Sequence, residues 1–482
     1  MSPFPGFSWL PLALVLAQAP APVPIQPEAW KLEVVHRKPP YLPLEGLVVR
    51  QDQSGIELRQ VIRKPGRPTF IITVNIPEDQ IDRVELLDSE ERGQLLRRLD
   101  QILAERAKRF ARLKLLDKPP PMGAEQIEPP QGLTKADWPT DKPGTNRAWK
   151  SSGQRFNLLT TARVEIAELC ALQLDQVFTA FERLLPPRQE AGPVTIWVTS
   201  SVEEWQALCK ARGRAVLNPA WCDPVTGEVG LATDLTRLDA RMDKLRALHA
   251  SQSQELQNRA DELRKAYGGK LPPELQKPFD QSLRSLRETA GANERVLRQE
   301  RDRLFARMNH EVFHAYLARF VLRPGSGGVP PWLNEGLAQV FEAALVEAGD
   351  LRADNADPER VKKFRADIQA GNDLPLTELL VLPASRFHVT GAADEENSRR
   401  AYLASWALCS WLVLEKGRLR LEDIDKITLP EGGKVDALRQ FEQVFGMNLA
   451  EAQNQLRDIY RKAAPGQLKA IPNPPVGEAP QP

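Results

Sequence analysis

His310-Glu311-Val312-Phe313-His314 (HEVFH) is the stretch of this sequence that says most about its fold. Apolar residues on both sides of it recur at the spacing of one helix face, which predicts that the motif lies within a helix. Residues four apart on a helix share a face, so the two imidazoles can reach a single metal ion at about 2.0–2.1 Å. Glu311 then lies just off that face, where its carboxylate can contact a water on the metal without being a ligand.

A catalytic zinc site needs a third protein ligand and one open position. In the metzincin pattern a third histidine follows six residues after His314, but Phe320 occupies that position. The other solution is a carboxylate from a following helix, and the sequence WLNEGLA (332–338) comes after a loop rich in Gly and Pro. Two prolines before Trp332 suit a helix start, which places Glu335 in the first turn. We therefore predict that Glu335 is the third ligand.

HEVFH followed by WLNEGLAQ resembles the gluzincins, the zinc metallopeptidases whose third ligand is a glutamate. The similarity is greatest to the bacterial peptidase MA-like proteins and related uncharacterised envelope families, and it covers about 150–460. It implies a mainly helical, zincin-like α+β catalytic domain with a small mixed or antiparallel sheet. It also implies one Zn²⁺ per chain, with His310, His314 and Glu335 as ligands and Glu311 as the general base.

Four further residues bear on this candidate site. Gln339 departs from the resemblance, because thermolysin-like relatives have an Asp at that position. Gluzincins resemble one another in having a Tyr on a later helix, which makes Tyr402 the candidate donor to the oxyanion, with His388 as its rival. Glu342 lies on the same helical face as Glu335 and is either a partner of a metal ligand or a surface charge.

The rest of the chain predicts further units, since 482 residues exceed one ordinary domain. Three short strands (47–50, 56–62 and 70–76) and a charged helix (79–115) predict a small β-meander plus helix domain over 30–115, followed by a Pro-rich linker at 116–148. The catalytic domain is expected at 149–462, with an antiparallel helical hairpin inserted at 237–300 and a disordered Pro-rich tail at 463–482. Within it, the expected strand at 227–233 could be an edge to which an extended peptide pairs.

The charge balance and the apolar segments of the chain indicate which partners and which cellular compartment to expect. Lys and Arg number 65 against 64 Asp and Glu, so no global field attracts nucleic acid. No apolar run is long enough for a transmembrane span. The apolar segment 7–17 predicts a signal peptide at 1–17, and hence an exported bacterial protein of the periplasm, envelope or extracellular space, although the first basic residue is Lys31.

Four cysteines exclude a disulfide scaffold. Cys170 and Cys409 sit in apolar helical patterns and are expected to be buried core thiols. Cys209 and Cys222 are close in sequence across a turn-rich segment, and they could be bridged if the chain is exported.

These observations predict that the protein is a zinc metallopeptidase. It would hydrolyse peptide bonds of a peptide or protein substrate through a metal-activated water. Two alternatives stay open. One is a catalytically silent zinc protein that binds partners in the cell envelope, and the other is a metallohydrolase of non-peptide amide bonds such as those of the cell wall. The sequence indicates no specificity pocket and no oligomeric state.

Overall fold

The computed structural model has a mainly helical α+β fold, as predicted. It describes residues 30–63, 69–116, 132–214, 218–323, 327–347, 350–352, 357–387, 392–415, 419, 421–428 and 436–462. The expected signal peptide (1–17) and tail (463–482) lie outside the described residues. Among the helices of the described ranges, none is both long and apolar enough to cross a membrane.

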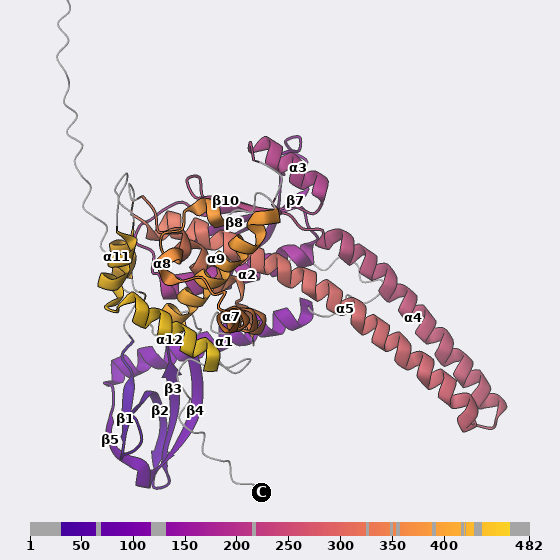
Figure 1. Ribbon diagram of the computed structural model, residues 1–482. Coiled ribbons are helices and arrows are strands. Elements are labelled where there is room, and N and C mark those ends of the chain that lie inside the picture. Colours follow the sequence, from indigo (N-terminus) through magenta and orange to yellow (C-terminus); the bar gives the residue numbers. More distant parts are fainter. Residues whose placement is uncertain are drawn as a thin grey trace, which may run out of the picture.

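The N-terminal unit is a five-stranded antiparallel sheet with one helix (Figure 1). Its strands have the order β4-β3-β2-β1-β5 and comprise β1 (Glu33–Arg37), β2 (Leu44–Asp52), β3 (Gly55–Ile62), β4 (Phe70–Pro77) and β5 (Ile81–Glu85). Helix α1 (Ser89–Leu116) buries Leu95 and Leu99 against Leu47 and Val61 of the sheet. A bidentate ion pair from Arg112 of α1 to Glu168 connects this unit to the rest of the chain.

This unit differs from the prediction at both ends of the expected meander. The three predicted strands are β2, β3 and β4, but β1 and β5 were not expected. The expected helix start at Asp79 is wrong, because 81–85 pair with β1 as a strand. The helix begins only at Ser89, where the Asp88 carboxylate accepts hydrogen bonds from the backbone N–H groups of Glu90 and Glu91.

A six-stranded mixed sheet of order β10-β11-β9-β8-β7-β6 forms one layer of the larger unit. It comprises β6 (Leu133–Ala136), β7 (Ala148–Ser152), β8 (Phe156–Thr160), β9 (Val194–Val198), β10 (Ala220–Asp223) and β11 (Glu228–Leu231). Strands β8, β9 and β11 are mutually parallel, and the other pairings are antiparallel.

Two predictions about this sheet are wrong. The expected linker at 116–148 is not a linker over 132–148, because β6 pairs with β7 and Trp138 is buried in a cluster with Trp197 and Trp205. The expected edge strand at 227–233 is not an edge, because β11 pairs with β9 on one side and with β10 on the other. The edge strand on this side of the sheet is β10, and β6 is the edge on the other side.

Helices α2 (Val164–Leu184) and α3 (Val202–Ala211) belong to the same unit as this sheet, and a long helical hairpin follows them in the chain. The hairpin consists of α4 (Leu235–Ala266) and α5 (Pro273–Tyr316), and it projects from the body of the molecule (Figure 1). A bidentate ion pair from Arg246 to Glu294 joins its two helices. Helix α5 has 44 residues and continues past the expected end of the insertion, so the HExxH motif lies on the same helix as the outer arm.

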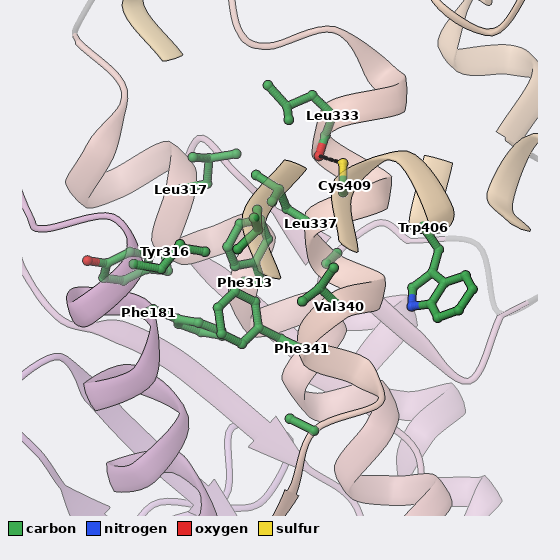
Figure 2. Packing of buried hydrophobic residues seen from close by; sticks show 14 of the residues in the cluster. Phe181, Phe313, Tyr316, Leu317, Leu333, Leu337, Val340, Phe341, Trp406 and Cys409 are labelled. Atoms are coloured by element: carbon green, nitrogen blue, oxygen red, sulfur yellow. Dashed lines mark hydrogen bonds between the residues drawn. The ribbon is translucent and has the colours of Figure 1, made fainter. Parts of the chain in front are cut away.

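The remaining helices share one hydrophobic core with the end of α5 that lies in the body. They are α6 (Pro331–Glu342), α7 (Pro358–Ala370), α8 (Leu376–Leu379), α9 (Ala392–Ser410), α10 (Leu421–Ile427), α11 (Ala437–Phe445) and α12 (Leu449–Lys462), with a small ribbon of β12 (Leu345–Glu347) and β13 (Asp350–Arg352). Phe313, inside the HExxH motif, contacts the rings of Phe181 and Phe341, with centroids 5.2 and 5.3 Å apart (Figure 2). This core holds α2, α5 and α6 together and so fixes the helix that carries both histidines.

Cys170 and Cys409 are fully buried in this core, as predicted. All four cysteines are free thiols, so the possible bridge between Cys209 and Cys222 is not formed.

Candidate metal centre

The predicted ligands meet where the last turns of α5 face the first turn of α6. The Nε2 atoms of His310 and His314 lie 3.3 and 3.6 Å from the same Oε2 atom of Glu335. One ligand atom from each of the three residues can be chosen so that all lie within 4.8 Å of one another. The side chains of His310, His314 and Glu335 are 16%, 14% and 16% exposed, so the group is largely shielded from solvent.

These separations fit a divalent metal ion. Ligand atoms about 2.0–2.2 Å from a tetrahedral zinc are about 3.3–3.6 Å apart, which matches the two distances to Glu335. The other ring nitrogens are already engaged: Nδ1 of His310 lies 3.2 Å from a Glu342 oxygen, and Nδ1 of His314 lies 3.0 Å from the Asn334 side-chain oxygen. Acceptors at both Nδ1 atoms favour the tautomer whose Nε2 lone pair points at a metal.

Glu342 is therefore a partner of a candidate ligand and not a surface charge, which settles the alternative left open by its sequence position. Its carboxylate also pairs with Arg360 of α7 at 3.0 Å. Burial opposes ionisation of Glu342, but His310 and Arg360 outweigh it and hold the pKa of this carboxyl below its usual value. The result is a chain of contacts from α7 through α6 to the imidazole of His310.

The departure at Gln339 has a structural explanation. The Gln339 side-chain amide donates to the backbone carbonyl of Tyr402 at 2.9 Å, and its own backbone carbonyl accepts from Arg360 at 3.0 Å. Gln339 thus connects α6 to α7 and α9, while Glu342, further along α6, contacts the histidine.

Gly336, next to the candidate ligand Glu335, lets α9 approach α6 closely. A Cβ atom at Gly336 would lie 2.5 Å from the carbonyl oxygen of Ser405 and closer still to the Cys409 sulfur, so only glycine fits without displacing α9. The Cys409 thiol in turn donates to the Leu333 carbonyl at 3.9 Å (Figure 2). This close crossing brings Tyr402, one turn before Ser405, to the metal-ligand group.

The Tyr402 hydroxyl lies near the carboxylate of Glu335, and its ring packs edge-on against Phe387 with centroids 5.3 Å apart. Burial and the carboxylates of Glu335, Glu311 and Glu342 raise the pKa of Tyr402 well above its usual value, so the phenol keeps its proton. The rival donor, His388, lies outside the described residues.

Glu311 lines a cleft of about 370 Å³ together with His310 and Tyr402. Within the described part of the chain, its carboxylate takes part in no hydrogen bond or ion pair. Burial raises the pKa of Glu311, and the two neighbouring histidines only partly oppose this effect. The carboxylate is thus free to accept a proton at a higher pH than an exposed glutamate.

The three ligand side chains also form a charge-coupled group. Burial disfavours the charged imidazole of His310, but hydrogen bonds to Glu335 and Glu342 outweigh it and raise its pKa to about 10. Burial likewise disfavours ionised Glu335, yet both histidines hold its pKa far below the usual value. A metal ion held by His310 at neutral pH would therefore displace a proton from its imidazole.

Two supporting residues were not expected from the sequence. Asn334 could have been noticed because it directly precedes Glu335, whereas Arg360 carries no local signal, since α7 reaches the site only through tertiary packing.

A family model described as "Protein of unknown function (DUF1570)" matches residues 305–427. This segment runs from the last turns of α5 to α10 and contains the three candidate ligands, Glu311 and Tyr402. No curated protein and no solved structure matches the chain. The matched segment is the part of the chain that builds the candidate metal centre.

Proposed function

We propose that this chain is a zinc-dependent metallopeptidase. The observation that carries the proposal is the convergence of His310, His314 and Glu335 next to a cleft that is lined by His310 and by a free carboxylate, Glu311. Two histidines and one glutamate are the donor set of known catalytic zinc sites, which keep one position open for water or substrate. One zinc ion per chain would be held by these three residues and, when bound, would supply Lewis acidity toward a water and the substrate carbonyl.

Glu311 is the general base in this proposal. Its raised pKa improves its ability to accept a proton at a carboxylate oxygen from the attacking water. The same carboxyl then delivers that proton to the leaving amine nitrogen, which returns Glu311 to its ionised form. Because no hydrogen bond holds Glu311 within the described residues, its carboxylate can serve both atoms in turn.

Tyr402 is the donor to the carbonyl oxygen. Its phenol remains protonated because burial and three carboxylates raise its pKa. A protonated phenol donates a hydrogen bond as negative charge develops on the substrate oxygen. The crossing of α9 over Gly336 fixes its place beside Glu335.

The edge strand β10 is where an extended substrate would bind. Ala220, its first residue, lines the same cleft as Glu311 and Tyr402. An edge strand presents unpaired backbone groups to which a peptide can add as a further strand. This arrangement favours a peptide over other amides, because the backbone of a peptide can match the strand.

A comparison of wild-type protein with the Glu311→Gln variant tests the proposal. Both are loaded with zinc and incubated with an unfolded protein and, separately, with cell-wall fragments. We expect the wild type to cleave the unfolded protein and the variant to lose about a hundredfold or more in rate while keeping its zinc. Zinc binding without cleavage of either substrate would favour the silent binding protein, and cleavage of the cell-wall fragments alone would favour the non-peptide amidase.

A further inference from the structure

Arg307 lines the candidate cleft one turn before His310 on α5 and is half-buried. Its Nε atom is buried and has no hydrogen-bond partner. No carboxylate in the described ranges lies within ion-pair distance of its guanidinium. Arg307 is therefore a cationic group of the cleft wall that forms no ion pair with the described part of the chain.

The other arginine of the cleft provides a contrast. Arg360 pairs with Glu342 at 3.0 Å and with Asp357 at 3.5 Å, and it donates to the Gln339 carbonyl at 3.0 Å. The N–H donors of Arg360 are therefore engaged by other residues of the chain. A guanidinium that is partly removed from water without a partner lowers stability, and burial lowers the pKa of Arg307 accordingly. Such an arrangement is expected where a ligand supplies the missing anion.

The position of Arg307 sets the part of the substrate that it can reach. Its Cα lies about 4.5 Å before that of His310 along the helix axis, and helical side chains lean toward the N-terminus. The charges that act on it are those of Glu300 and Arg303, which lie further from the metal centre. The guanidinium is therefore placed to bind a substrate group that lies next to the scissile bond, and not the carbonyl group that reacts. Asn218 and Ala220, where β10 begins, line the same cleft.

We propose that Arg307 is a specificity-determining residue that binds a carboxylate of the substrate. The proposal rests on the proposed peptidase function. The planar guanidinium fork matches a carboxylate in a bidentate manner. That carboxylate is either an acidic side chain near the scissile bond or the C-terminal carboxylate of a short peptide bound along β10.

A set of quenched fluorescent peptides on one scaffold separates these sources. The set contains a neutral peptide, peptides with Glu at each position flanking the scissile bond, and each peptide with a free or an amidated C-terminus. The quantity measured is the ratio of kcat/KM for the acidic or free-acid peptide to that for its neutral counterpart. We expect Arg307→Gln to lower this ratio about tenfold or more, and Arg307→Lys to restore part of it.

Arg295→Gln is the matched control, because Arg295 is exposed on the same helix and its loss changes the net charge equally. It should keep the wild-type ratio. Thermal unfolding of Arg307→Gln distinguishes a structural role, because loss of a cation that forms no ion pair within the described chain should leave the midpoint unchanged or raise it. A ratio equal to that of the wild type in Arg307→Gln, or a marked fall in its midpoint, would overturn the proposal.

A second readout does not depend on catalysis. If wild-type protein cleaves none of the peptides, the peptidase proposal fails, and fluorescence anisotropy of the same labelled peptides still tests Arg307. Binding that prefers the acidic or free-acid peptides and is lost in Arg307→Gln would support the role of Arg307. Equal binding by both proteins, or binding by neither, would contradict it.

Discussion

The Nδ1 atom of His310 lies 3.2 Å from Oε2 of Glu342, a carboxylate two turns beyond the candidate ligand Glu335 on the same helix. This contact orients the imidazole so that its Nε2 faces Glu335.

Loss of such a supporting partner of a metal ligand typically lowers metal affinity about 10–100-fold. We expect this reduction in zinc affinity for Glu342→Gln, measured by competition with a chromophoric chelator. Glu359→Gln, an exposed carboxylate nearby, is the control and should bind zinc like the wild type. Unchanged affinity in Glu342→Gln would show that the contact does not orient the ligand.

Gly336→Ala should disturb the crossing of α6 and α9. The added methyl group would collide with the Ser405 carbonyl and the Cys409 sulfur, so α9 must shift. Overpacking of this kind lowers the free energy of unfolding by about 1–3 kcal/mol, and the shift should also separate Tyr402 from Glu335. Gly291→Ala is the matched control, because a Cβ at this helical glycine of α5 meets only the flexible end of Arg295 at 3.7 Å. It should raise stability by about 0.5–1 kcal/mol. Equal effects of both substitutions in denaturant unfolding would refute the close-packing role.

Zinc affinity should rise with pH. In the metal-free protein the pKa of His310 is raised from 6.5 to about 10, so zinc displaces a proton at neutral pH. Between these two values, His310 alone should increase the apparent affinity about tenfold per pH unit. The stability of the metal-free protein should change in the opposite direction and fall as the pH rises. The proton on His310 stabilises the folded state fully below the usual pKa of 6.5, and this stabilisation is lost as the pH rises through about 10. Chelator competition at several pH values measures the first effect, and a flat profile would exclude coupling to His310.

Tyr402→Phe removes one hydroxyl from the cleft. If the phenol donates to the developing oxyanion, kcat should fall about 100-fold or more while KM changes little. Zinc content should remain that of the wild type, because Tyr402 is not among the three candidate ligands. Full turnover in this variant would remove Tyr402 from the proposed mechanism.

The sequence predicts the three ligands because each of them is positioned by residues close to it along the chain. Helix periodicity places His310 and His314 on one face, and the prolines before Trp332 start the helix that presents Glu335. The partners of these ligands depend on tertiary packing. Arg360 reaches Glu342 only because α7 folds back on α6, and no spacing along the chain predicts that contact.

The errors in the sheets have the same origin. Residues 227–233 read as an isolated strand, and only the pairing of β10 across the turn moves it to the sheet interior. The charged segment 81–85 lies within a helical pattern, but pairing with β1 makes it a strand. Tertiary pairing overrides local propensity in both cases.

The most direct test of the proposed metal centre is the zinc content of this chain, purified without chelators and measured by elemental analysis. We expect one zinc per chain in the wild type, and a strong reduction in both His310→Ala and Glu335→Ala. Absence of bound metal after incubation with zinc, or unchanged content in both variants, would contradict it.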